Sequence, residues 1–203
     1  MKREEAYKLM TEMIKNPNLQ KHGLAVEAIM RELCKYLRKR EKLDPSALSQ
    51  DDKWWDIEFD EEEWAIVGLL HDADYELIEK DPTRHTLVTE ERVRPLGASE
   101  RIINGIKAHH DGIKETRDNY LEKSVYAADE LSGLITACAL VKEKKLSNVT
   151  VETVMKKFPE KNFAAGAKRD QILACENELK VPLEEFVGIA LKAMQGISKE
   201  LDL

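Results

Sequence analysis

Apolar residues recur at intervals of three and four positions along most of the chain, which is the spacing of one face of an α-helix. The clearest stripe consists of Ala25, Val26, Ile29, Met30, Leu33 and Leu37. No convincing run of alternating β-branched residues indicates a strand. The pattern therefore predicts an all-α fold.

Proline, asparagine and acidic residues indicate where these helices begin and end. An opening helix over about residues 3–15 should end at the Asn-Pro-Asn sequence of positions 16–18, and the striped helix follows it. Charged and proline-containing sequence then predicts a polar loop through residues 44–52. The acidic run at 59–63 is typical of a capped helix start, so a third helix is expected over about residues 64–72.

The second half of the chain is expected to alternate turns and helices. Prolines and a glycine in residues 74–98 predict short helical pieces, and Ser99 can cap a helix that ends at 111–112. The longest helix is expected over about residues 121–144, with two or three more helices from residue 148 onward. The inward face of the helix after Ser99 would carry Ile102, Ile103, Ile106 and then His109 or His110.

Length and charge narrow the classes of protein. At ~150 residues per domain, 203 residues predict a single domain over residues 1–203, with a core of about 18–145 and a helical extension of about 148–203. The chain has 32 Lys and Arg against 39 Asp and Glu, a net charge of −7. Because an acidic surface repels phosphate backbones, no nucleic acid polymer is expected as a partner. The oligomeric state stays open.

Neither a membrane nor an oxidising compartment is indicated. The longest apolar runs fall far short of the ~20 residues that a membrane span needs. The start of the chain turns acidic at once and has no apolar region of a signal peptide. Cys34, Cys138 and Cys175 are far apart and odd in number, which indicates buried thiols rather than disulfides. We therefore expect a cytoplasmic protein with no membrane contact.

Histidine and aspartate residues in apolar surroundings are the candidate functional residues. All five histidines fall between residues 22 and 110. A lone histidine on an apolar face, as at His22, is more often a hydrogen-bonded core residue than a metal ligand. However, His71 and Asp72 close an otherwise apolar helix, and Asp129 lies within an apolar segment where an unpaired charge is costly.

These residues match the pattern H…HD…D in His22, His71-Asp72 and Asp129. The stretches around them, at 21–28, 67–76 and 126–131, make the chain similar to the HD superfamily of metal-dependent phosphohydrolases over roughly residues 18–140. The remainder resembles the tail of a subgroup of small bacterial HD-domain hydrolases. The resemblance implies an all-α HD-domain helical bundle, here with additional C-terminal helices, and an enzyme that hydrolyses phosphate bonds.

The resemblance also implies a set of metal ligands, and the ligand chemistry agrees with it. His22, His71, Asp72 and Asp129 would form a mixed nitrogen and oxygen site that suits Mn, Fe, Co, Ni or Zn better than Mg. Binuclear members add histidines, for which His85 and His109 are candidates, with Asp72 as the bridging carboxylate. The number of ions, one or two, stays open. Since adjacent helical residues point about 100° apart, His110 is expected beside the metal or as an acid or base.

The implied reaction is attack of a metal-activated hydroxide on phosphorus. Asp74 could orient water or act as acid or base, although a helix cap is the plainer interpretation. The substrate is expected to be small and phosphorylated, with a nucleotide favoured, and monoesters, diesters and pyrophosphates stay open. Candidate cations for the phosphate are Lys107, Lys114, Arg117 and Arg84, each of which is more often a solvated surface charge.

Two other classes of protein compete with the enzyme. A metal- or nucleotide-binding sensor could keep the fold without turnover, and a purely structural helical protein would use its histidines in the core. Tyr75, Tyr126 and the pair Trp54-Trp55 could stack on a base, although packing is the more common use of such rings. No nucleophile motif, Walker loop or dinucleotide fingerprint is present, which disfavours covalent catalysis and those folds.

Overall fold

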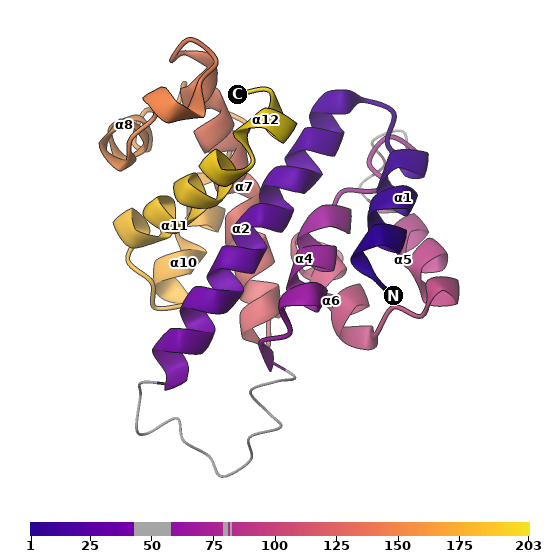
Figure 1. The fold of residues 1–203 in the computed structure, drawn as a ribbon. Helices are drawn as coiled ribbons and strands as arrows, with labels where there is room; N and C mark the ends of the chain where they lie inside the picture. Colours follow the sequence, from indigo (N-terminus) through magenta and orange to yellow (C-terminus); the bar gives the residue numbers. More distant parts are fainter. Residues whose placement is uncertain (43–57, 79–80, 82) are drawn as a thin grey trace.

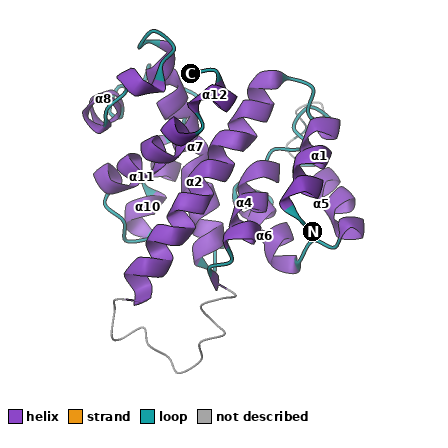
Figure 2. Cartoon of the chain, viewed as in Figure 1, coloured by secondary structure: helices purple, strands orange, loops and turns teal. Residues whose placement is uncertain are grey.

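The computed structural model describes residues 1–42, 58–78, 81 and 83–203. Within these residues the chain forms helices and turns with no strand (Figure 2). The predicted all-α class is thereby confirmed. The predicted loop at 44–52 and the pair Trp54-Trp55 lie outside the described residues.

The helices before residue 142 lie where the sequence pattern places them, although two of their lengths differ. The elements are α1 (Arg3–Met13), α2 (Pro17–Lys42), α4 (Glu61–Leu70), α5 (Leu87–Val93), η1 (Arg94–Leu96), α6 (Glu100–Ala108) and α7 (Tyr120–Leu140). The expected caps are present: Asp60 accepts from the backbone N–H groups of Glu62 and Glu63, and Ser99 accepts from that of Ile102. These side chains satisfy N–H groups that have no partner inside the helix.

The central element is α2, which crosses the molecule between two sets of helices (Figure 1). Its predicted apolar stripe is buried, and it packs against α4, α7 and α11 (Leu183–Gly196). In Figure 1, α1, α4, α5 and α6 lie to one side of α2, whereas α8 (Val151–Lys157), α10 (Ala174–Asn177) and α11 lie to the other. Residues from both sets therefore meet along this one helix.

Two glycines allow α2 and α4 to approach at backbone distance. A Cβ atom on Gly23 would lie 2.9 Å from the carbonyl oxygen of Leu69. A Cβ atom on Gly68 would lie 2.8 Å from the carbonyl oxygen of Val26 and 2.9 Å from the Cα atom of Glu27. Such distances leave no room for a side chain. Because His22 precedes Gly23 and His71 follows α4, this contact brings two candidate ligands together.

Two predicted helix lengths are wrong. The longest helix is α2, with 26 residues, and not α7, with 21. The charged residues at 38–42 continue α2, because lysine and arginine are favourable near the negative end of the helix dipole. Conversely, α7 stops at Leu140, and Glu143 and Lys144 adopt positive φ angles of 60° and 55°.

The C-terminal part contains more helical pieces than predicted. Besides α8 and α11, it forms η2 (Leu146–Asn148) and three single turns: α9 (Arg169–Ile172), α10 and α12 (Ser198–Leu201). Four-residue turns carry too little periodicity to be found in a sequence. Helices α9, α10 and α11 pack against α7, and α11 and α12 pack against α2. The extension thus covers the same two helices that carry His22 and Asp129.

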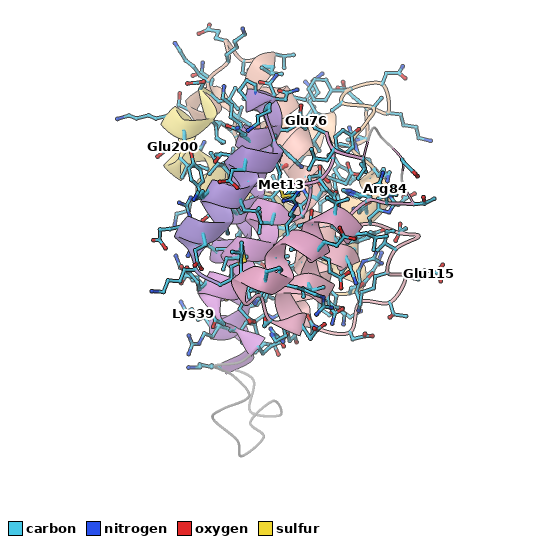
Figure 3. The ribbon with its side chains drawn as sticks, turned by 90° about the vertical axis from the view of Figure 1, so that its right-hand side faces the viewer. Met13, Lys39, Glu76, Arg84, Glu115 and Glu200 are labelled. Atoms are coloured by element: carbon cyan, nitrogen blue, oxygen red, sulfur yellow. The ribbon has the colours of Figure 1, made fainter. Side chains whose placement is uncertain are left out.

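The surface and the thiols are also as the composition indicates. Charged side chains, such as Lys39, Glu115 and Glu200, lie at the periphery (Figure 3). The three cysteines are buried and free, and burial raises the pKa of Cys34 to about 12, which makes it a poor nucleophile. Across the described ranges, no helix has the length and apolarity required to cross a membrane.

Candidate metal centre

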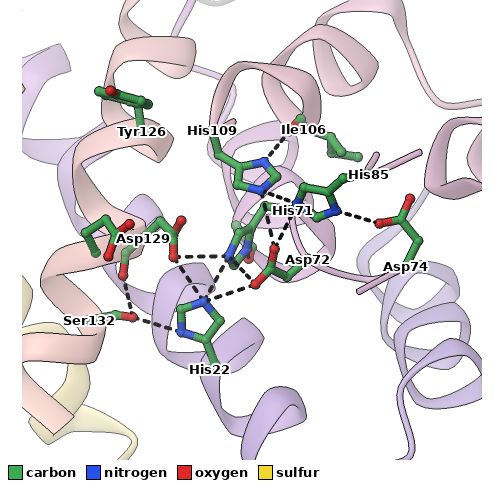
Figure 4. Close-up of polar contacts among 12 residues, drawn as sticks. His22, His71, Asp72, Asp74, His85, Ile106, His109, Tyr126, Asp129 and Ser132 are labelled. Carbon is green, nitrogen blue, oxygen red and sulfur yellow. Dashed lines mark hydrogen bonds and ion pairs between the residues drawn. The ribbon is translucent and has the colours of Figure 1, made fainter. Parts of the chain in front are cut away.

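Six of the predicted ligands meet in one cluster, although they come from five parts of the chain (Figure 4). His22 belongs to α2, His71 and Asp72 follow α4, His85 precedes α5, His109 follows α6, and Asp129 belongs to α7.

The first group of ligand atoms combines two imidazoles and two carboxylates. The Nε2 atoms of His22 and His71 are 3.0 Å apart. Asp129 Oδ1 lies 3.1 Å from His22 Nε2 and 3.5 Å from His71 Nε2. Asp72 Oδ2 lies 3.7 Å and 3.8 Å from the same two nitrogens. His22, His71 and Asp72 thus form a group that could hold a metal ion, and Asp129 lies against both of its imidazoles.

The second group shares Asp72 with the first. The Nε2 atoms of His85 and His109 are 2.8 Å apart. The other oxygen of the same carboxylate, Asp72 Oδ1, lies 3.2 Å from His85 Nε2 and 3.3 Å from His109 Nε2. Asp72 thus directs one oxygen atom into each group, which is the arrangement of a bridging carboxylate.

Two of the histidines are oriented by the helices that they end. His71 Nδ1 donates to the carbonyl oxygen of Gly68 at 2.8 Å, and His109 Nδ1 donates to that of Ile106 at 2.6 Å. In both cases the acceptor is three residues earlier, in the last helical turn, where carbonyl groups lack a partner inside the helix. Each ring therefore projects its Nε2 atom beyond the helix end.

The other two histidines are oriented by side chains. His85 Nδ1 donates to Asp74 Oδ1 at 2.8 Å. Ser132 donates its hydroxyl hydrogen to the carbonyl oxygen of Asp129 and accepts from His22 Nδ1 at 3.0 Å. Since each Nδ1 atom faces an acceptor, it holds the proton of the neutral ring, and the Nε2 lone pairs point into the cluster.

This arrangement of nitrogen atoms fits a bound cation. Two lone pairs that face each other at 3.0 or 2.8 Å repel unless a proton or a metal ion lies between them. Two ligand atoms that are each ~2.1 Å from one tetrahedral ion lie roughly 3.4 Å apart. The distances from the two imidazole nitrogens of the first group to each other and to the carboxylates, from 3.0 to 3.8 Å, bracket this separation. The donor set thus fits a divalent metal ion.

The electrostatics of the cluster also favour positive charge. Although burial alone would lower the pKa of His71, the carboxylates of Asp72 and Asp129 raise it to about 9. Burial of His85 is likewise outweighed by Asp72 and Asp74, and its pKa is also raised to about 9. Burial would raise the pKa of Asp72, but the adjacent histidines hold it well below its usual range. A metal ion that binds here competes with protons for the same nitrogens.

A cavity of about 480 Å³ opens onto both groups. Its volume lies in the range of small-molecule sites. Beside the five ligands His22, Asp72, His85, His109 and Asp129, it is lined by Leu19, Tyr75, Ile78, His110, Glu130, Gly166, Lys168 and Gln171.

The structure places Asp74 at the start of α5, as the helix-cap interpretation expects, and not in the cavity, where it could act on water. Asp74 is fully buried, with one oxygen on His85 Nδ1 and the other accepting from the backbone N–H of Thr89 at 3.1 Å. It therefore lies behind His85, outside the cavity lining. Asp74 thereby holds a strained turn in place: Thr86, which lies between His85 and Thr89, has a φ of 67°, and this value is strained for a β-branched residue.

The expected cations near His109 do not reach the cavity. Lys107 pairs with Glu90 at 2.5 Å, since a residue two positions before His109 points about 200° away on the helix. Lys114 pairs with the buried Glu122 at 2.6 Å.

Arg117 and Arg84 are also absent from the cavity lining. Arg117 pairs with Asp111 at 2.5 Å and donates to the carbonyl oxygen of Ala108. Its guanidinium carbon lies 3.3 Å from the ring centre of Tyr126, so this tyrosine packs against arginine and not against a ligand. Arg84 is exposed in the turn before His85.

His110 and Tyr75 do border the cavity. The ring of His110 is 5.1 Å from that of His85, between centroids, so it lies beside the second group. Tyr75 is 39% exposed, and its ring centroid lies 6.3 Å from that of His85. Both side chains are therefore placed where a ligand above the second group would contact them.

Sequence reasoning missed three residues that shape the site. Ser132 orients His22, and Gln171 donates to the carbonyl oxygens of His109 and Tyr126 at 3.2 and 3.0 Å. Lys168 lines the cavity from the C-terminal part of the chain. For Ser132 a usable signal existed, because it lies three residues after Asp129 on the same helix face. Gln171 and Lys168 reach the site only through tertiary packing.

The fold and the site define a helical protein with a cluster of His and Asp able to hold a divalent metal. The family model for the HD domain matches residues 19–134, which include all six clustered ligands. The chain belongs to the HD superfamily of metal-dependent phosphohydrolases. Neither a curated protein nor a solved structure matches it.

Proposed function

We propose that this protein is a metal-dependent phosphohydrolase that acts on a small phosphorylated molecule, with nucleotides as the favoured class. Membership of the HD superfamily supports the reaction class. The observation that carries the proposal is the pair of facing Nε2 sets, at 3.0 and 2.8 Å, joined by the two oxygens of Asp72.

The proposed ligands divide into two sites. His22, His71, Asp72 and Asp129 would hold one ion, and Asp72, His85 and His109 would hold a second. Mixed imidazole and carboxylate ligands favour Mn, Fe, Co, Ni or Zn over Mg. When bound, such ions polarise the phosphoryl group and lower the pKa of a water molecule, which supplies the nucleophile.

The residues around the ions have separate proposed tasks. Asp74, Ser132 and the two helix-end carbonyl groups keep each imidazole in the tautomer that leaves Nε2 free. His110 borders the cavity beside His85 and is the proposed acid or base. Leu19, Tyr75 and Ile78 offer an apolar surface for the organic part of the substrate.

The test is metal content followed by turnover. Chelator-free protein, untagged, is analysed for transition metals, loaded with Mn²⁺, and then assayed against phosphate monoesters, cyclic diesters, nucleotides and dinucleotides. We expect one to two ions per chain and hydrolysis of at least one class. Asp72→Ala should lower turnover by at least ~10³-fold, because both groups lose an oxygen and with it several kcal/mol of charge stabilisation.

The matched control is Asp118→Ala, which removes an exposed carboxylate that pairs with Lys114. It should leave metal content and turnover within about twofold, as is typical of surface ion pairs. Near-normal turnover by Asp72→Ala, with its helical circular dichroism intact, would refute the assignment. Metal binding without turnover of any compound would instead favour a sensor.

A further inference from the structure

The chain segment of residues 158–168, named here the capping loop, borders the candidate metal centre from the C-terminal part of the protein. Gly166 and Lys168 line the cavity of about 480 Å³ described above. Ala164, Gly166 and Ala167 line an adjoining hollow of about 280 Å³ that also contacts His22 and Asp129. The loop is outside the stretch that the HD family model matches, residues 19–134.

One arginine organises this loop. The guanidinium of Arg169 donates to four backbone carbonyl oxygens, those of Phe158, Phe163, Ala164 and Ala167, at 2.6 to 3.0 Å. Backbone carbonyl groups of a loop have no secondary-structure partners, so each of these charge-assisted bonds fixes part of the loop's course. Four bonds from one side chain fix its path from Phe158 to Ala167.

A second contact attaches the end of the loop to the metal centre. The backbone N–H of Lys168 donates to Glu130 Oε2 at 3.1 Å, and Glu130 follows the candidate ligand Asp129 on α7. The side chain of Lys168 is 68% exposed, and its Nζ atom lies 3.9 Å from Glu130 Oε1. The backbone is therefore held while the ammonium group keeps hydrogen-bond donors for another partner.

Lys168 differs from the other nearby cations in this respect. Lys107, Lys114 and Arg117 form ion pairs at 2.5 or 2.6 Å outside the cavity. Among the described residues that line the cavity, Lys168 is the only lysine or arginine. A phosphate group held above the candidate ions would have this ammonium group as its nearby cation from the protein.

We propose that Lys168 binds the phosphate of the substrate and that Arg169, through the capping loop, positions it. The substrate class is a phosphate monoester, because a terminal phosphate carries close to two negative charges near pH 7 whereas a diester carries one. This inference rests on the proposed function for the substrate, but anion binding by Lys168 is testable without turnover.

The experiment measures binding of inorganic phosphate to the Mn²⁺-loaded full chain by calorimetry. Lys168→Gln should weaken binding about tenfold, the usual value of one hydrogen bond to a charged group, and Lys168→Arg should restore most of it. The matched control is Lys161→Gln, which removes the same charge from an exposed position of the same loop. Unchanged phosphate binding by Lys168→Gln, or equal losses in both glutamine variants, would overturn the proposal.

A kinetic arm tests the substrate class. With an aryl phosphate monoester and the matching diester, Lys168→Gln should raise KM for the monoester about tenfold and change that for the diester less. Equal effects on the two substrates would contradict the monoester assignment. If the wild-type protein turns over neither compound while its phosphate binding still depends on Lys168, the proposed function fails and the anion site stands.

The role of Arg169 is tested by a double-mutant cycle. Arg169→Gln should weaken phosphate binding in the wild-type background and add nothing in the Lys168→Gln background, because it acts only through Lys168. Additive losses would show that Arg169 has no positioning role. Arg169→Lys, which keeps the charge but loses the planar set of donors, should behave as Arg169→Gln does, and it replaces that variant if glutamine prevents folding.

Discussion

The two ligand groups of the candidate metal centre are built in different ways. The first group takes His22 from the middle of α2, Asp129 from α7 and His71 from the end of α4. The second group takes His109 from the end of α6, but His85 from a turn. That turn is strained at Thr86 and is held by the buried carboxylate of Asp74.

This difference in construction predicts which of the two sites should bind its metal ion more tightly. Helix packing fixes the first group in advance, so a metal ion there costs little ordering. The second group depends on one buried carboxylate that both orients His85 and anchors the strained turn. We therefore expect the first site to be filled at lower metal concentration, and the second to respond to changes outside its own ligands.

The largest expected effect is the difference in turnover and metal content between His71→Ala and His85→Ala. Loss of His71 removes a ligand of the first site, and we expect turnover to fall by at least ~10³-fold because several kcal/mol of charge stabilisation are lost. Loss of His85 should lower the metal content from about two ions to about one and leave the first site filled. Elemental analysis and steady-state kinetics check both, and a His85→Ala variant that loses both ions would contradict the ranking.

A smaller effect is expected when the support of the second site is changed without touching a ligand. In Asp74→Asn the amide NH₂ must face either His85 Nδ1–H or the N–H of Thr89, so one hydrogen bond is replaced by a donor–donor contact. Affinity for the second ion should fall about 10- to 100-fold, as for other residues that orient metal ligands. Competition with a metal indicator measures this, and Asp118→Asn is the control.

Backbone contact between α2 and α4 can be broken by one methyl group. Gly68→Ala places a Cβ atom 2.8 Å from the carbonyl oxygen of Val26, which should destabilise the protein by about 1–3 kcal/mol. Gly188→Ala adds the same atom inside α11, where the nearest side-chain atom is 3.8 Å away, and should be neutral or stabilising by up to ~1 kcal/mol. Urea unfolding measures the free energy of unfolding of both variants, and equal values would contradict the close approach of α2 and α4.

The smallest effect is a pH dependence of the chelator-treated protein. The pKa values of His71 and His85 are raised from 6.5 to about 9, so their contribution to stability is complete below pH 6.5 and is lost as the pH rises through 9. The melting temperature should therefore fall over this window. Added Mn²⁺ should stabilise the protein increasingly over the same window, because the ion no longer competes with protons. A melting temperature that rises with pH in the chelator would contradict this.

Much of the fold and of the cluster could be predicted from the sequence. The stripe of α2, the Asp60 and Ser99 caps and the burial of His71 at a helix end are local features, which periodicity and capping rules describe. The resemblance to HD phosphohydrolases pointed to six side chains, and the structure brings them together.

The cations of the site could not be predicted, because sequence distance is a poor guide to spatial distance. Lys107 is two residues from His109 but points to Glu90, whereas Lys168 is 59 residues away and lines the same cavity. The choice between a helix cap and an acid or base at Asp74 could not be made from the sequence for a related reason, since only tertiary packing shows that both its oxygens are engaged. A charged side chain can serve the site only if it has no stronger partner elsewhere in the fold, and the sequence does not show those partners.

Gly68 has a consequence for how the protein would report metal binding. Its Cα atom faces the backbone of α2, and its carbonyl oxygen holds the imidazole of His71. A ligand-dependent restraint on His71 is therefore transmitted directly to the close backbone contact between α4 and α2. Amide hydrogens of α2 and α4 should exchange more slowly when metal is present. Hydrogen exchange would then report metal binding and local opening of the core in the same experiment.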